Sequence, residues 1–263
     1  MTASGQILID IQDGIATIRL ANPQRRNAIS TPMWQALRAF AASAGARADI
    51  RVVIVRGDGD AAFSAGADIS DFEGGRSNVA QARIYDDMVE DACRAFEAIP
   101  QPTVALLRGP CVGAGASLAA SCDLLAAADD VFFAVPAAKL GLGYDPRGIE
   151  RFLRVFGMPG TRGLLYTAER LPAARAHALG AVHMLAPAVG FDEAADALVR
   201  RVAANAPLTI KAAKVAIRAL TVQREAGLMS QANALAGIAD ASADYVEGRR
   251  AFAEKRAARF RGN

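Results

Sequence analysis

Short β-branched runs alternate with helical segments along most of the chain, and this order leaves few folds open. The run Arg51–Arg56 reads RVVIVR and the run Pro102–Leu107 reads PTVALL, and both are typical of buried strands. The segment between them predicts a helix from about Asn78 to Ile99. Because two strands and a helix recur before helices alone remain, we expect an α/β fold.

The N-terminal segment predicts a β-hairpin followed by a helix. Gln6–Ile11 and Ile15–Leu20 are rich in β-branched residues and flank Asp13-Gly14, a dipeptide that favours tight hairpin turns. Ser30 suits the N-cap of a helix, with a proline in the first turn. Apolar residues then follow at helical spacing from Met33 to Phe40, so one face of this helix is predicted to be buried.

Later segments suggest a division of the chain into two parts. Further short strands are predicted at 123–128, 131–135 and 182–185, and helices dominate from Arg147 onward. No low-complexity segment or long linker interrupts the chain. We therefore expect a core over residues 1–190, followed by a helical region over residues 191–263.

The supply of histidine, cysteine and charge argues against several classes of protein. The chain of 263 residues has two histidines and three cysteines, and their spacings build no zinc signature. The net charge is +3, but residues 247–263 hold six basic and two acidic residues, so the rest of the chain carries −1. A basic excess this local argues against a nucleic-acid partner.

No targeting segment is evident in the sequence. The start MTASGQILIDIQDG lacks the basic residues and apolar run of a signal peptide. No uncharged apolar stretch reaches the ~18 residues of a membrane helix, and an odd, scattered cysteine set suits a reducing compartment. We expect a soluble, cytoplasmic protein with no membrane partner.

Two familiar motifs are incomplete. GDGDAA at Gly57 follows a strand, but a dinucleotide site also needs a helix opening there and an acidic residue about 20 positions later. Ser117 lies in GASLA, which is not the GxSxG sequence of a nucleophile elbow. The sequence therefore predicts neither a dinucleotide site nor a Ser-His-Asp triad.

Three segments together carry a more specific signal: RRNAIS at Arg25, AAFSAGADIS at Ala61 and GPCVGAGASLAASCDLLAA at Gly109. In these segments the chain resembles the enoyl-CoA hydratase/isomerase family, or crotonase superfamily, and the resemblance extends over nearly the whole sequence. It implies a crotonase-like spiral of repeated ββα units with a C-terminal helical trimerisation region, assembled as a homotrimer or homohexamer. It also implies an acyl-CoA substrate and no cofactor beyond the coenzyme A that the substrate carries.

The chemistry of that family fits the small residues in these segments. A thioester that becomes an enolate gains negative charge on its carbonyl oxygen, which two aimed backbone N–H groups can stabilise. Small residues at Ala65–Ala67 and Gly113–Gly115 let the backbone approach the thioester, and each stretch precedes a predicted helix. By resemblance, the two donors are the backbone amides of Ala67 and Ala114. Taken singly, the glycines would indicate only tight turns.

The resemblance also places residues along the coenzyme A channel. Arg25 and Ala28 belong to the turn that lines this channel in the family, and Ala65, Asp68 and Ile69 would border the adenine and pantetheine. Residues that match Phe252 and Lys255 reach the coenzyme A of a neighbouring subunit in family members. With Arg256 and Arg259, they are spaced to share one face of a predicted helix. A solvated basic face is the alternative interpretation.

Two expected catalytic residues are missing. Hydratases of the family use two glutamates, one three residues after the second oxyanion donor and the other after the proline of an FxxPE segment. Those positions hold Ser117 and Ala137 in this chain. Alanine cannot exchange a proton, and serine is a poor general base unless another group activates it. We therefore expect no two-glutamate hydration mechanism.

One acidic residue remains in a suggestive place. Asp145 follows KLGLGY, at a position where family isomerases that move a double bond often carry an acid, and Tyr144 matches a tyrosine of the family's decarboxylases. Asp145 could also cap the helix predicted near Arg147, because aspartate before proline is a common helix start. These two interpretations stay open.

The sequence thus favours isomerase-like or other enolate chemistry over hydration, with Asp145 as proton carrier. One alternative is a protein that binds acyl-CoA without catalysis. Another is an enoyl-CoA hydratase with an atypical acid or base.

Overall fold

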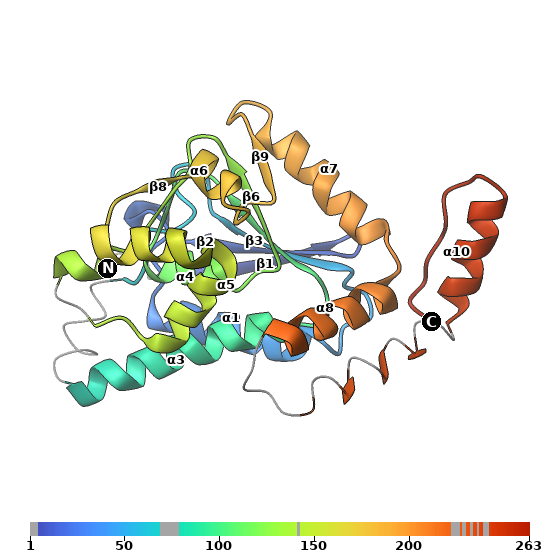
Figure 1. Cartoon of the computed structure of the whole chain (residues 1–263), viewed down its shortest axis with the longest axis horizontal. Coiled ribbons are helices and arrows are strands. Elements are labelled where there is room, and N and C mark those ends of the chain that lie inside the picture. Colours follow the sequence, from blue (N-terminus) through green and yellow to red (C-terminus); the bar gives the residue numbers. More distant parts are fainter. Residues whose placement is uncertain are drawn as a thin grey trace.

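The computed structural model describes residues 5–68, 79–140, 143–221, 227, 230–231, 234–235, 237–238 and 242–263. Among these, two sheets form the centre of the molecule (Figure 1). The larger sheet has six strands in the order β1-β2-β3-β4-β6-β9, and the smaller has three in the order β5-β7-β8. The strands are β1 Gln6–Gln12, β2 Ile15–Ala21, β3 Val52–Gly57, β4 Thr103–Leu107, β5 Pro110–Val112, β6 Leu124–Ala128, β7 Phe132–Ala134, β8 Leu171–Pro172 and β9 Met184–Ala186.

Helices surround the sheets. The α-helices are α1 Thr31–Ala44, α3 Val79–Glu97, α4 Ala114–Ala120, α5 Pro146–Arg162, α6 Ala173–Ala178, α7 Phe191–Ala204, α8 Pro207–Thr221 and α10 Ala243–Ala253. Short 3-10 segments span Pro23–Arg25 and Pro136–Leu140, and one π-helical turn spans Gly163–Thr167. Within the described residues, none of the helices combines the length and apolar character needed to cross a bilayer.

The N-terminal hairpin forms as predicted. β1 and β2 pair in antiparallel orientation, with Gln12 opposite Ile15 at the turn. Asp13 has φ 51° and Gly14 has φ 78°, and a tight two-residue hairpin turn needs positive φ at both positions. β2 then pairs in parallel with β3, which begins the parallel part of the sheet.

The repeated strand-strand-helix order is also confirmed. β4 is followed by β5 and then α4, and β6 is followed by β7. The first strand of each pair joins the large sheet, and the second joins the small sheet parallel to its counterpart. Each turn of the chain therefore adds one strand to each sheet, which gives the expected α/β spiral.

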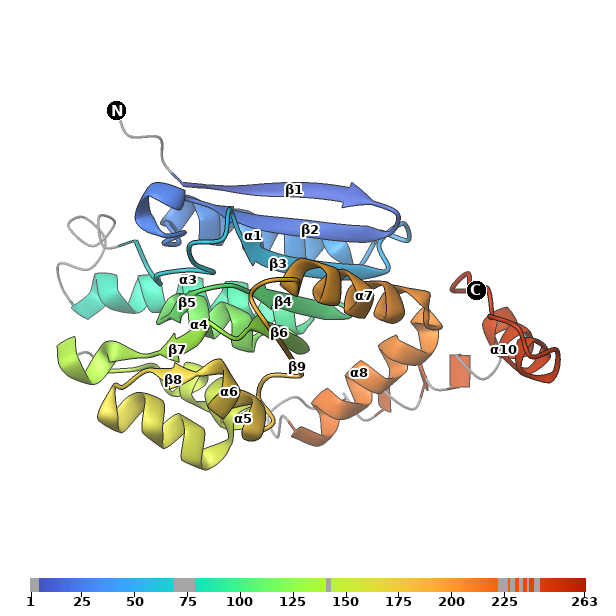
Figure 2. The ribbon, with the colours of Figure 1, turned by 90° about the horizontal axis from the view of Figure 1, so that it is seen from above.

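α1 and α3 cover one face of the large sheet, and α7 lies on the other side (Figure 1; Figure 2 gives the view from above). α1 buries Trp34 and Leu37 completely, which confirms the apolar face predicted for this helix. Ser30 occupies the N-cap as expected, but its side chain makes no capping hydrogen bond. The proline at the start of α1 therefore remains the sequence feature that favours initiation there.

The predicted basic helical face at the C-terminus is wrong. α10 ends at Ala253, before Lys255, whose φ of 52° is incompatible with a continuing right-handed helix. The chain then turns back, and the Arg259 amide donates to Glu247 Oε1 at 3.0 Å. Arg256 also pairs with Glu247. These contacts with α10 replace the extra helical turn, so Lys255, Arg256 and Arg259 do not share a helical face.

Candidate active site

Two adjacent backbone segments form the floor of one pocket. The segment Ser64–Asp68 runs between Ile29 and Val112, and a backbone hydrogen bond joins it to each of them. On one edge the Ile29 amide donates to Gly66 O at 2.7 Å, and on the other the Val112 amide donates to Ser64 O at 2.9 Å. Backbone hydrogen bonds on both sides fix the direction of the peptide groups between Ser64 and Asp68.

The second segment joins β5 to α4 and approaches the first closely. Gly113 has φ 52° and donates its amide to Ala134 O at 2.8 Å. At Gly66, where φ is 103°, an added Cβ would lie 3.0 Å from Val112 O and 3.6 Å from Ala114 N. Both glycines adopt angles that side chains rarely allow, and Gly66 also permits the close approach of the two segments.

Ala67 and Ala114 lie at this junction, and both line the pocket. Ala67 follows Gly66, whose carbonyl oxygen accepts the Ile29 amide. Ala114 is the first residue of α4, where a helical N–H has no intrahelical acceptor. Across the described parts of the chain, neither amide donates a hydrogen bond to a protein acceptor. Two residues that line the pocket thus carry backbone N–H groups without a protein acceptor among the described residues.

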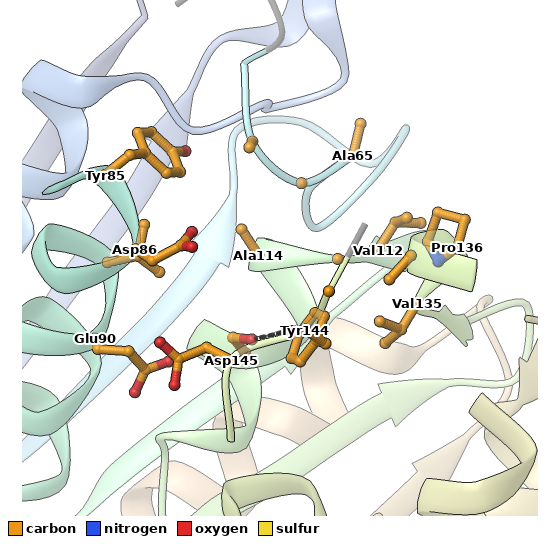
Figure 3. A pocket seen from close by; sticks show the side chains of 17 residues that line it. Ala65, Tyr85, Asp86, Glu90, Val112, Ala114, Val135, Pro136, Tyr144 and Asp145 are labelled. Carbon is orange, nitrogen blue, oxygen red and sulfur yellow. Dashed lines mark hydrogen bonds between the residues drawn. The ribbon is translucent and has the colours of Figure 1, made fainter. Parts of the chain in front are cut away.

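The pocket itself is a cavity of about 230 Å³ (Figure 3). Most of its surface is apolar, and the polar side chains come from α3, α4 and the segment before α5. Of the residues predicted as site residues, those that line it are Ala65, Ala67, Ala114, Ser117, Ala137, Tyr144 and Asp145. Residues that are more than 75 positions apart in the sequence therefore meet at one cavity.

Ser117 and Tyr144 share a hydrogen bond across the pocket, with Oγ and Oη 2.7 Å apart. The Tyr144 ring stacks on Phe152 with the centroids 5.6 Å apart. Burial raises the pKa of the Tyr144 phenol well above its ordinary value, so the phenol stays protonated at neutral pH. The Ser117 hydroxyl therefore faces a neutral partner, which does not activate it as a base.

Asp145 combines the two roles that the sequence left open. Its Oδ1 accepts the Arg147 amide at 2.8 Å and so caps α5, while the residue also lines the cavity. The Arg147 guanidinium contacts both carboxylate oxygens, at 3.0 Å on Oδ1 and 2.6 Å on Oδ2. This contact lowers the pKa of the Asp145 carboxyl below its ordinary value, so the group is ionised at neutral pH and is a weak base.

Two acidic residues of the pocket were not among the predicted site residues. Asp86 and Glu90 lie one turn apart on α3 and line the cavity. Glu90 forms two hydrogen bonds with Arg151, at 3.1 and 2.8 Å, and their side chains are only 5% and 2% exposed. A signal was present in the sequence, because Glu90 follows Val89 on the apolar face of an amphipathic helix, where an unpaired charge is costly.

Other predicted site residues lie outside the cavity lining. Arg25 and the largely buried Asp68 form an ion pair beside the Ser64–Asp68 segment, and Ala28 is buried. Ile69 is outside the described residues, as is the side chain of Phe252. Lys255 is exposed and follows α10, which Figures 1 and 2 place at the opposite end of the molecule from α4.

Comparisons with known proteins bear on the family and the fold of the chain. The family model for enoyl-CoA hydratase/isomerase matches residues 10–263. The chain is 34% identical over 257 residues to the probable enoyl-CoA hydratase echA6 of Mycobacterium leprae, covering 95% of this chain and 97% of that protein. An enoyl-CoA hydratase/carnithine racemase structure from Magnetospirillum magneticum superposes with a TM-score of 0.92 at 32% identity, covering 99% and 97% of the two chains. An enoyl-CoA hydratase structure from Bacillus anthracis gives 0.87 at 28% identity, with 98% and 100% covered.

Proposed function

The chain belongs to the enoyl-CoA hydratase/isomerase family, and we propose that it binds an acyl-CoA with the thioester carbonyl oxygen between the Ala67 and Ala114 amides. The observation that carries this proposal is the meeting of these two amides at one cavity, where no protein acceptor within the described residues takes either N–H. Donors fixed in advance stabilise the charge of an enolate more than that of the neutral thioester, and this difference lowers the barrier to enolate formation.

The proposed reaction is isomerisation of a double bond or another enolate reaction, rather than hydration. Hydration in this family uses two glutamates, and the corresponding positions hold Ser117 and Ala137. Ala137 brings no ionisable group, and Ser117 is bonded to the neutral Tyr144 hydroxyl. Asp145 lines the cavity in its ionised form, so a single carboxylate is available to move a proton between two carbons.

We also propose that coenzyme A crosses the surface beside Arg25 and Ala28, with Asp68 holding Arg25 in place through their ion pair. Lys255 follows α10, which lies well away from α4 in Figures 1 and 2, so we assign its contact with coenzyme A to a neighbouring subunit. Phe252, which belongs to α10, is assigned the same role. This assignment supports assembly as a homotrimer or homohexamer.

A second candidate function is acyl-CoA binding without catalysis. The observation that favours it is the geometry of Asp145, whose two carboxylate oxygens are both engaged by Arg147. A carboxylate held in this way is a poor proton acceptor unless Arg147 moves when the substrate binds.

Proton exchange in deuterated water separates these functions. We expect a 3-enoyl-CoA to incorporate deuterium at the α-carbon and to shift its double bond, as followed by NMR and by ultraviolet absorbance. The variant Asp145→Asn keeps a capping oxygen but removes the base, and it should abolish the shift while acyl-CoA still binds. Tight binding without exchange in the wild-type protein would favour the second candidate, and fast hydration of a 2-enoyl-CoA would contradict both.

A further inference from the structure

The side of the cavity formed by α3 and the start of α5 is acidic. Asp86, Glu90 and Asp145 bring carboxylates to this side, and we call the three residues the acidic wall (Figure 3). Among the described residues that line the cavity, none is lysine, arginine or histidine. The remaining lining is chiefly backbone and apolar side chains, so these carboxylates set the sign of the charge that a bound group meets.

Among the described residues, the arginines that pair with Asp145 and Glu90 are shared with carboxylates outside the acidic wall. Arg147 is shared between Asp145 and Asp87, and Arg151 is shared between Glu90 and Glu97. Arg154 also pairs with Glu97 and with Glu150. Three arginines thus serve five carboxylates, and none of these arginines belongs to the cavity lining. Glu90 and Asp145 line the cavity and their arginine partners do not, so in the described lining a bound ligand is closer to carboxylates than to guanidinium groups.

The acidic wall and the two donor amides border the same cavity. An acyl group whose carbonyl oxygen lies between the Ala67 and Ala114 amides must therefore extend beside the acidic wall. A second carboxylate on that acyl group would lie near like charge in a poorly solvated space, where repulsion is stronger than in water. An uncharged acyl chain meets no such repulsion.

We propose, on the basis of the proposed acyl-CoA function, that the substrates are acyl-CoA thioesters whose acyl group carries no negative charge, and that the acidic wall excludes carboxylated acyl groups. The amides create the binding site, and the acidic wall determines which acyl groups enter it. Asp86 and Asp145 are the positions chosen to test this role, because removal of the Glu90 carboxylate would leave the buried Arg151 without its buried partner.

Matched ligand pairs test the proposal. Pentanoyl-CoA and glutaryl-CoA have the same chain length and differ in a methyl or carboxylate end, as do hexanoyl-CoA and adipoyl-CoA. By calorimetry we expect each uncharged ligand to bind at least about tenfold more tightly than its carboxylated partner. Desolvation of a carboxylate alone also favours the uncharged ligand, so the change of this ratio in variants is the decisive measurement.

In Asp86→Asn and in Asp145→Asn, which keeps a capping oxygen, the ratio should fall by threefold or more through tighter binding of the carboxylated ligand. Asp91→Asn removes the same charge from α3 at an exposed position outside the cavity lining and should leave the ratio unchanged. A ratio that stays the same in both cavity variants, or wild-type protein that binds both members of each pair equally, would overturn the role of the acidic wall. If no acyl-CoA binds at all, the proposed function itself fails.

Discussion

Replacing Ala114 by proline would remove one amide hydrogen from the pocket with little change to the helix. Ala114 is the first residue of α4, a position where proline is well tolerated because the helix does not use that N–H. The preceding residue is Gly113, with φ 52° and ψ −118°, the mirror image of an extended conformation, and it has no Cβ to clash with the proline ring. The substitution therefore tests a donor that no side-chain change can reach.

The expected effect follows from the loss of one of two donors. Removing one oxyanion donor typically costs about 3–4 kcal/mol of transition-state stabilisation, which corresponds to a fall of roughly 10²–10³ in kcat. We expect a loss of this size in α-carbon deuterium exchange or in 3-enoyl-CoA isomerisation for Ala114→Pro. The infrared stretch of a bound ¹³C-labelled thioester carbonyl should also move toward its value in solution, because one hydrogen bond to the oxygen is lost.

Ala114→Gly is the matched control, because it changes the side chain and keeps the N–H. Its helix cost is at most about 1 kcal/mol, and its exchange rate should stay close to that of the wild type. Thermal unfolding of both variants checks that the fold is intact. Wild-type exchange and an unshifted carbonyl band in a folded Ala114→Pro protein would refute the role of this amide.

Three further predictions concern stability and reactivity. Arg147 lowers the pKa of the Asp145 carboxyl in the folded protein. The stabilising contribution of this carboxylate is therefore present above the unfolded-state pKa of ~3.9 and is lost as pH falls through the lower folded value. The free energy of unfolding, measured in urea from about pH 5 downward, should depend less on pH in Asp145→Asn than in wild type. Leu37 is fully buried beneath the sheet, so Leu37→Ala should cost about 2–5 kcal/mol in the same measurement, and a cost below about 1 kcal/mol would contradict the packing described for α1. Burial raises the pKa of Cys93 to about 11, and all three cysteines are buried. A thiol reagent at about pH 8 should therefore modify them only after the protein unfolds, and rapid labelling of the native protein would contradict their burial.

Elements with a strong local signal could be predicted from the sequence. The hairpin around Asp13-Gly14 and the strand β3 follow from turn chemistry and β-branched runs, and the structure confirms both. β5 and β8 were not predicted, because β5 leads into a glycine-rich segment and β8 is only Leu-Pro, so neither has a strand signal of its own; both form through pairing with β7. The order of elements was thus available from the sequence, whereas the second sheet depends on tertiary contacts.

The residues of the pocket were likewise predicted only in part from the sequence. The glycine-rich segments pointed to Ala67 and Ala114 through their resemblance to a known family, and both residues line the cavity. Asp86 and Glu90 were missed, because an acidic residue on a helix is ordinarily solvated and only the packing of α3 brings these two to the cavity. The basic C-terminal face was predicted wrongly, because the reversal after α10 depends on Glu247, a contact that helical spacing does not report.

The segment Ser64–Asp68, held by backbone hydrogen bonds on both edges, has a consequence for mutational tolerance. If the Ala67 amide is a catalytic donor, then a saturation scan of the segment should not show the usual pattern, in which functional positions accept few residues. Position 67 should accept many side chains and reject proline, since its contribution is an N–H that every other residue supplies. Intolerance should appear instead at Gly66, where any side chain would press on Val112. On the proposed function, substitutions of the surrounding side chains could change the reaction while the backbone N–H groups that stabilise charge are kept.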